Sequence, residues 1–172
     1  MQRSLLLGCG NSRKKIVYMG DSPDWVGELT TLDLDTNCGA DVIHDMENRP
    51  LPFPDETFDE IGSYNAMEHW GRQGDFRGWF DEMAEYWRLL KPGGTFGCMV
   101  PVGQDALADP GHTRFFHPNY FGFLVKKFYT DNLAKGACVT DYRWYINTWW
   151  DVLHLERAQS SHLTVLLRKV VG

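Results

Sequence analysis

The sequence has few cysteines, and they are not spaced as in metal or disulfide sites. The four stand far apart, without a CxxC pair or a short cluster with histidine: Cys9, Cys38, Cys98 and Cys138. Zinc sites and disulfide-stapled folds have characteristic cysteine spacings, so the sequence predicts neither a metal centre nor a disulfide framework. Unpaired thiols fit a reducing compartment, and we therefore expect a cytoplasmic protein.

Long apolar runs and an excess of positive charge are also missing. The run Leu5–Leu7 is far too short for a signal peptide, and no stretch has the length of a membrane span. Lysine and arginine total 17 against 23 aspartate and glutamate, a formal net charge of −6. Because phosphate neutralisation supplies most nonspecific affinity for nucleic acids, this balance argues against a nucleic-acid partner, and we expect no membrane association.

The composition that is present is that of a globular protein. The chain of 172 residues is 43% hydrophobic and 14% aromatic, which is enough to bury a core but short for two domains. We therefore expect residues 1–172 to form a single domain with one site. Most of the aromatic side chains should lie in its core.

A glycine-rich turn follows the first predicted strand. The apolar residues Leu5–Leu7 show no polar alternation, which is typical of a strand buried on both faces of a parallel sheet. Gly8 and Gly10 then leave the strand end without side chains, so backbone amides can approach a ligand closely. Ligands of open α/β sheets bind at such strand ends, and the turn indicates a nucleotide-like cofactor, although a GxG pair alone also occurs in ordinary turns.

Acidic residues end the next two predicted strands. Residues 29–34 form the second strand, with Asp33 near its end, and residues 41–45 form the third, which ends in Asp45. Only residues 36–40 connect them, which is tight for a parallel crossover. Either the connection is an irregular loop or one of the two strand predictions is wrong.

The rest of the chain predicts further strands, a long helix and a hairpin. Apolar residues at helical spacing run from an N-cap at Asp75 to the stop Lys-Pro-Gly-Gly at residues 91–94. Residues 11–29 are interrupted by glycine and proline, so the usual crossover helix there is short or missing. The other predicted elements are strands at 58–65 and 95–100, a helix at 118–128, and a hairpin of strands 149–156 and 163–170 that turns at 158–161.

The chain resembles class I S-adenosylmethionine-dependent methyltransferases of the type 11 group over most of its length. Several ordered segments carry the resemblance, and together they are far more specific than any one alone. They are Leu7-Gly8-Cys9-Gly10 (family LGCGxG), Asp33 and Asp45 after the second and third strands, residues 51–59 (LPFPDxSFD), Met67-Glu68-His69 (LEH) and residues 88–94 (RxLKPGG). The resemblance implies an α/β, Rossmann-like fold with a mostly parallel seven-stranded sheet and a C-terminal antiparallel β-hairpin, here with abbreviated N-terminal helices.

The resemblance also implies the cofactor S-adenosylmethionine and the residues that bind it. Gly8 and Gly10 would lie against its methionine part, and Asp33 would accept hydrogen bonds from both ribose hydroxyls. Asp45 would bind the adenine amino group, and Asn65 would lie near the sulfonium. The complete expected set is Gly8, Cys9, Gly10, Asn11, Asp33, Leu34, Asp45, Met46 and Asn65.

Two residues depart from the family pattern at the methionine end of the site. Leu6 stands where the family often has an acid, and Ser12 replaces the third glycine of the motif. Asn11, or a backbone carbonyl near it, is the candidate to hold the methionine amino group instead. The short connections after the first two strands imply that the cofactor is covered less than usual, or is covered by residues 11–27.

Two histidines are the candidates for a catalytic base. Methyl transfer from positively charged sulfur needs mainly alignment, a dry pocket and removal of the acceptor's proton, and histidine titrates near neutrality. His112 lies in residues 109–116, which resemble a DPxHxRxF stretch on the loop that carries acceptor contacts in similar methyltransferases, so we rank it above His69. Alternatively, His112 only orders its loop. Arg114 either binds an anionic acceptor or pairs with Asp109.

The acceptor is less constrained than the cofactor. Residues 64–67 stand where amino-methylating DNA enzymes carry a DPPY-type or NPPF-type motif, and no Pro-Cys nucleophile motif is present. With the acidic balance, this favours methyl transfer to an O or N atom of a small molecule or glycan. Two alternatives stay open. One is a nicotinamide-dependent oxidoreductase, against which Arg13 at the third glycine position of GxGxxG counts, and the other is a non-catalytic methyltransferase-like binding module.

Overall fold

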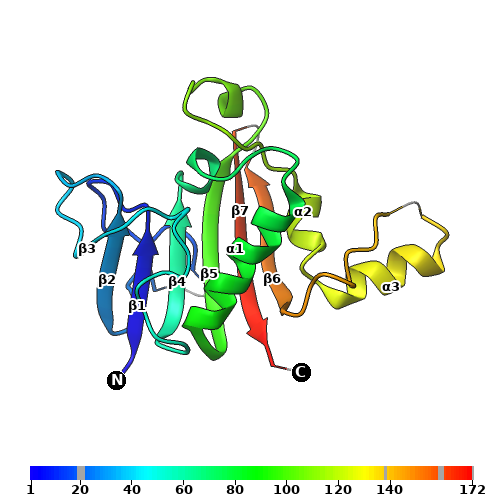
Figure 1. Ribbon diagram of the computed structural model, residues 1–172, viewed down its shortest axis with the longest axis horizontal. Coiled ribbons are helices and arrows are strands. Elements are labelled where there is room, and N and C mark those ends of the chain that lie inside the picture. The colour runs from blue at the N-terminus through cyan, green and yellow to red at the C-terminus, as the bar shows by residue number, and fades with distance from the viewer. Residues whose placement is uncertain (19–21, 138, 159–160, 172) are drawn as a thin grey trace.

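The computed structural model describes residues 1–18, 22–137, 139–158 and 161–171, so Cys138 and part of the predicted hairpin turn lie outside it. Seven strands form one sheet in the order β3-β2-β1-β4-β5-β7-β6 (Figure 1). Their bounds are β1 Arg3–Leu7, β2 Glu28–Asp33, β3 Val42–Ile43, β4 Phe58–Tyr64, β5 Leu90–Pro101, β6 Trp149–Ala158 and β7 His162–Val170. The helices are η1 Met67–His69, α1 Phe76–Leu89, η2 Asp105–Leu107, α2 Pro118–Gly122 and α3 Lys126–Ala134.

One strand of the sheet runs against all the others. β1 pairs in parallel with β2 and β4, β2 with β3, and β4 with β5, whereas β7 is antiparallel to both β5 and β6. The predicted mostly parallel seven-stranded sheet with a C-terminal antiparallel hairpin is therefore confirmed. The order of the sheet reverses at β1, from which β2 and β4 lie on opposite sides, and ligands of such sheets bind at this point.

The strand β1 is buried on both faces, as its unbroken apolar run predicted. Leu5 and Leu7 belong to the large core that includes the buried face of α1. Leu6 points to the opposite face and packs with Cys9 and Cys38 in a second, smaller cluster. Because successive side chains of a strand alternate between faces, three apolar residues in a row serve both layers.

Helix α1 lies across the front of the sheet in Figure 1 and begins where its N-cap predicted. The Asp75 side chain accepts a hydrogen bond from the Gly78 amide, and Tyr86 stacks on Phe96 of β5 with 5.0 Å between ring centroids. The helix ends at Leu89, and β5 begins at once because Leu90 pairs with Phe58 of β4. Residues 91–94, expected as the helix stop, do follow the end of the helix, and they belong to a longer strand than the predicted 95–100.

The helix predicted at residues 118–128 is in fact two helices. The amide of Trp150 in β6 donates to the Leu124 carbonyl at 3.1 Å, so this carbonyl does not take part in a continuous helix. Val125 adopts an extended conformation at the start of α3, which then runs to Ala134. Nowhere in the described residues does a helix combine the length and the apolar character of a membrane span.

The short connection between β2 and β3 is an irregular loop, and both predicted strands are present. The third is shorter than the predicted 41–45, since β3 contains only Val42 and Ile43 and ends before Asp45. Leu32 pairs with Val42 and Asp33 with Ile43. Hydrogen bonds hold the end of the loop against β2, because the amide and the hydroxyl of Thr31 donate to the Asp41 carboxylate at 2.8 and 2.7 Å. These hydrogen bonds favour the ionised carboxylate and hold the pKa of Asp41 below its usual value.

The residues described between β1 and β2 pack against the face of the sheet opposite α1, through Val17 and Trp25. At Gly62 of β4 a Cβ atom would lie 2.6 Å from the Trp25 ring, so the missing side chain makes room for the segment. Lys15, in the same segment, forms an ion pair with Glu60 of β4, with 2.6 Å between Nζ and Oε2. Both side chains are at most 10% exposed. The residues described between β1 and β2 contain no helix, as the broken sequence pattern predicted.

Replacing Lys15 by methionine should destabilise the fold, because it leaves the Glu60 carboxylate buried without its cation. Breaking a buried ion pair costs about 3–5 kcal/mol. Glu60 keeps hydrogen bonds from the Ser4 hydroxyl and the Val26 amide, so we expect a loss of about 3 kcal/mol in the free energy of unfolding, measured with urea. Lys14→Met, at the exposed neighbouring position, is the matched control and should change it by less than about 0.5 kcal/mol. Equal effects of the two substitutions would contradict this assignment.

Candidate functional site

A cavity of about 420 Å³ lies at the carboxyl ends of the strands, where the order of the sheet reverses. Its volume falls within the range of small-molecule and cofactor sites. Seven of the nine residues expected to bind the cofactor line it: Gly8, Gly10, Asp33, Leu34, Asp45, Met46 and Asn65. The turn after β1, the end of β2, the segment after β3 and the end of β4 thus meet around one space.

The glycine turn needs both its left-handed backbone and its missing side chain. Gly8 and Gly10 have φ values of 59° and 47°, which favour glycine. A Cβ atom on Gly8 would lie 2.4 Å from the Cβ of Ala66, whereas one on Gly10 would meet nothing within 4 Å. Gly8 therefore lets the turn pack against the segment after β4, and Gly10 leaves open space at the cavity.

Asp33 is anchored by the backbone and keeps capacity for further hydrogen bonds. Its Oδ2 accepts from the Gly10 amide at 2.7 Å, and its Oδ1 accepts from the Asp35 amide at 2.9 Å. Each carboxylate oxygen has a second lone pair, so the fixed side chain can still accept two hydrogen bonds from a ligand in the cavity. Beside it, Leu34 is 65% exposed and offers an apolar surface to the same ligand.

The other expected residues approach the cavity from β3 and β4. The Asp45 carboxylate accepts from the Glu47 amide at 2.8 Å, which fixes the turn that buries Met46. Asn65 has a left-handed φ of 50°, and its amide donates to the Met99 carbonyl of β5 at 2.8 Å. This conformation is uncommon for a residue other than glycine and ends β4 at the cavity, with Asn65 exposed.

Two of the nine expected residues do not line the cavity. Cys9 is buried beneath the turn, and burial raises the pKa of its thiol to about 11, which keeps it protonated and unreactive near neutrality. Asn11 is exposed and lies outside the lining. The motif places both residues next to the turn, but the turn directs one of them into the core and the other toward solvent.

The two candidate bases lie together, edge to face. His69 is exposed and lines the cavity, and its ring centroid is 4.7 Å from that of His112. Nδ1 of His112 lies 2.8 Å from the Ala106 carbonyl, which can only accept, so Nδ1 carries the proton. Nε2 of His112 then faces Glu68, with 3.9 Å to its Oε1. Burial raises the pKa of the Glu68 carboxyl.

Arg114 forms an ion pair that its sequence context did not suggest. Its guanidinium is buried and donates to both carboxylate oxygens of Glu82 on α1, at 2.8 and 3.1 Å, and to the Met67 carbonyl at 3.0 Å. Asp109 instead accepts from the Gly111 amide at 2.7 Å. The expected pair with Asp109 is therefore wrong, because Glu82 and the Met67 carbonyl hold the terminal nitrogens of the guanidinium inside the core. The contact with an anionic acceptor stays a prediction, since Arg114 also lines a cavity at the N-terminal end of α1.

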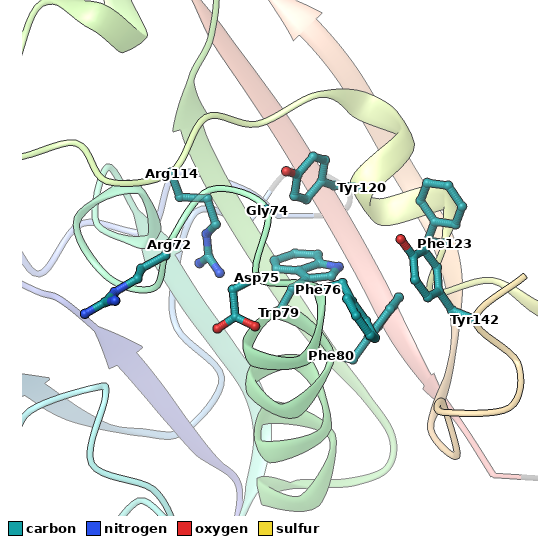
Figure 2. A pocket seen from close by; sticks show the side chains of 10 residues that line it. All are labelled: Arg72, Gly74, Asp75, Phe76, Trp79, Phe80, Arg114, Tyr120, Phe123 and Tyr142. Carbon is teal, nitrogen blue, oxygen red and sulfur yellow. The ribbon is translucent and has the colours of Figure 1, made fainter. Parts of the chain in front are cut away.

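A second, smaller cavity of about 180 Å³ lies at the N-terminal end of α1. Figure 2 shows aromatic side chains gathered on one side of it, including Phe123 and Tyr142, with Arg72 and Arg114 on the other. The two cavities share no lining residue. Even close neighbours in the chain are divided between them, since Trp70 lines the larger cavity and Arg72 the smaller one. The two spaces are thus separate, and only the larger one touches the glycine turn.

The comparisons with known proteins agree with this geometry. A family model described as a methyltransferase domain matches residues 5–98, more than half of the chain. The chain belongs to this family of methyltransferase domains. Its cofactor is S-adenosylmethionine, and the matched residues include every expected cofactor residue. None of the curated proteins that were compared matches the chain.

Several solved structures share the fold of this methyltransferase domain. An S-adenosylmethionine-dependent methyltransferase from Methanosarcina mazei is 12% identical, with a TM-score of 0.57, and covers 99% of this chain and 93% of its own. The [4+2]-cyclase SpnF is 15% identical, with a TM-score of 0.57 and coverage of 99% and 75%. A putative methyltransferase from Haloferax volcanii, solved with the activator Trm112, is 15% identical, with a TM-score of 0.54 and coverage of 99% and 83%. At these identities the likeness concerns the fold.

The residues of the methyltransferase domain fit this cofactor, and some of them were missed in the sequence. Left-handed glycines, an anchored carboxylate with free lone pairs and an exposed leucine suit a ligand with a charged tail, a ribose and a flat ring. Glu47, Ala66 and Trp70 also line the cavity but were not expected. Each of them directly follows an expected site residue or motif in the sequence, namely Met46, Asn65 and the Met-Glu-His stretch, and the sequence contains no other indication of their role.

Gly8→Ala should destabilise the domain more than Gly10→Ala does. Both substitutions place a side chain at positive φ, which costs about 1–2 kcal/mol, but only the first drives a Cβ atom into Ala66. We expect an additional loss of about 1–3 kcal/mol for Gly8→Ala, measured as the free energy of unfolding in urea. Equal losses at the two positions would contradict the close packing at Gly8.

Proposed function

We propose that this protein is an S-adenosylmethionine-dependent methyltransferase that acts on an O or N atom of a small-molecule or glycan acceptor. The observation that carries the proposal is the placement of Asp33. Its carboxylate is fixed by two backbone amides, keeps two accepting positions, and lines the cavity formed by the glycine turn and the segment after β3. A carboxylate in this position suits the paired hydroxyls of a ribose.

The roles proposed for the other residues follow from their positions around the cavity. When bound, the cofactor supplies a methyl group on positively charged sulfur. The backbone at Gly8 and Gly10 lies along its methionine part, Asp33 holds the ribose, and Asp45 with the adjacent Met46 holds the adenine. Leu34 covers apolar surface of the ligand, which accounts for its exposure.

The acceptor end of the site lies, in this proposal, near Asn65 and His69. Both side chains are exposed, and both residues line the cavity on the side formed by the segment after β4. His69 is placed to take the acceptor's proton, and His112 packs against it and holds its ring in position. Buried Ala66 and Trp70 line the same side and help to exclude water. The order of the two histidines is thus the reverse of the order inferred from the sequence.

The acceptor class is supported by charge. The chain carries a net charge of −6, and three carboxylate residues line the cavity, namely Asp33, Asp45 and Glu47. Such a surface repels a polyanionic backbone, which supports a neutral or cationic acceptor over a nucleic acid. The [4+2]-cyclase among the structural neighbours carries a different reaction on this fold, so methyl transfer itself has to be measured.

Asp33→Ala should weaken binding of S-adenosylmethionine by about 1.5–3 kcal/mol, because hydrogen bonds to a charged group are lost. The measurement is calorimetric titration with S-adenosylmethionine or S-adenosylhomocysteine. Asp24→Ala, an exposed acid outside the cavity, is the control and should leave the affinity unchanged. An unchanged affinity in Asp33→Ala would remove this residue from the cofactor site.

Incubation with methyl-labelled S-adenosylmethionine and a cell extract should transfer label to a small-molecule or glycan fraction. Asp33→Ala should transfer much less label under the same conditions. Label that appears mainly in nucleic acid would overturn the acceptor class. Cofactor binding without transfer to any fraction would favour a non-catalytic binding module, and binding of a nicotinamide cofactor without S-adenosylhomocysteine binding would favour an oxidoreductase.

A further inference from the structure

Three side chains with metal-binding chemistry meet at the edge of the cofactor cavity. Glu68 and His69 belong to η1, and His112 lies on the loop after η2. One ligand atom from each side chain lies within 4.8 Å of the corresponding atoms of the other two. This group cannot be recognised from sequence spacing, because its members come from two segments that are far apart in the chain.

Nε2 of His112 and the Glu68 carboxyl group face each other, and no lysine or arginine side chain is bonded to either of them in the part of the chain that the structure describes. Nδ1 of His112 donates to the Ala106 carbonyl, so the ring turns its other nitrogen, Nε2, toward the Glu68 carboxyl group. When the ring carries only the proton on Nδ1 and the carboxyl is ionised, these two atoms are both acceptors. Glu68 is 2% exposed, and its Oε2 has no hydrogen-bond partner among the residues that the structure describes. Arg114 does not fill this need, since its terminal nitrogens donate to Glu82 and Met67.

The spacing of the two acceptors suits a shared ion better than a hydrogen bond. Oε1 of Glu68 and Nε2 of His112 are 3.9 Å apart, which is too long for a hydrogen bond. Two ligands at about 2.0–2.2 Å from one metal ion lie roughly 3–4 Å apart. Small side-chain movements would bring the exposed His69 into the same shell, because all three ligand atoms already lie within 4.8 Å.

We propose that Glu68, His69 and His112 bind a divalent transition-metal ion. Two imidazoles and one carboxylate are a donor set that Zn²⁺, Mn²⁺, Co²⁺ and Fe²⁺ accept, and three protein ligands leave positions open for a further molecule. A ring N–H held by a backbone carbonyl, as in His112, is the arrangement that fixes the tautomer of a metal-binding histidine.

This site deepens the proposed function and rests on it for its role in catalysis. Because His69 lines the cofactor cavity next to Asn65, the ion lies at the acceptor end of the cavity. With the ion bound, His69 serves as a ligand, and this replaces the role of base proposed for it above. An acceptor hydroxyl that binds at an open position of the ion loses its proton to water more easily. The oxygen then forms a bond to the methyl carbon while the methyl–sulfur bond breaks, and the sulfur keeps the electron pair. The acceptor class is therefore a hydroxyl compound, and the product is a methyl ether.

The test is metal binding by the full chain without S-adenosylmethionine, with Zn²⁺ followed by calorimetry and Co²⁺ by its visible absorption. We expect about one ion per chain, and a roughly tenfold or greater loss of affinity in Glu68→Gln, His69→Ala and His112→Ala. His154→Ala removes an exposed histidine that also lies near a glutamate, on β6, and is the matched control. Cys38→Ser is a second control, because Cys9, Asp33 and Cys38 form another group of possible ligands.

The outcomes separate this proposal from the proposed function. Failure of the wild type to bind either ion, equal affinity in the three variants, or loss of binding in Cys38→Ser alone would overturn the metal site. If Glu68→Gln does not fold, the metal affinity of His69→Ala, which changes an exposed side chain, still tests the site. Calorimetric titration with S-adenosylhomocysteine is run in parallel. Metal binding without cofactor binding would reject the methyltransferase and keep the site, and the reverse would reject the site alone.

Discussion

The buried ion pair between Glu82 and Arg114 is the interaction on which the geometry of the site depends. Both side chains are almost completely excluded from solvent, and the Arg114 guanidinium lies over the rings of Trp79 and Phe116 at 5.2 and 5.0 Å. Two charges of this kind are costly to bury and are tolerated only when nearly every polar atom finds a partner. Here the Trp70 indole and the Tyr86 hydroxyl also donate to Glu82, each at 2.9 Å.

This pair joins three parts of the chain that are far apart in sequence. Glu82 belongs to α1, Trp70 follows η1, and Arg114 follows the loop that carries His112. Because the guanidinium is bound to α1, the loop before it lies against η1, where the Thr113 amide donates to the Glu68 carbonyl at 2.9 Å. The neighbouring histidines are thereby brought into contact. Burial and the nearby Glu82 raise the pKa of Tyr86 well above its usual value, which keeps its hydroxyl protonated as a donor.

The parts of the molecule that depend on local sequence could be predicted. The apolar run of β1, the Asp75 N-cap of α1 and the position of Asp33 at the end of β2 follow from neighbouring residues, and the structure has them as expected. Asp45 lines the cavity as expected, but it lies two residues beyond the end of β3. The parts that depend on distant partners could not be predicted. The break before α3 comes from a hydrogen bond between Leu124 and Trp150, and the role of Arg114 comes from the Glu82 carboxylate on α1.

The position of β7 in the sheet has a consequence for the order of assembly. β6 precedes β7 in the chain, yet β6 pairs only with β7, which itself pairs with β5. β6 and β7 are neighbours in the chain and can pair as a hairpin, but β6 can join the sheet only through β7. The burial of Trp150 of β6 in the core therefore depends on the pairing of β7 with β5, which joins residues more than sixty positions apart. Pairing over such a distance in sequence is slow compared with local contacts.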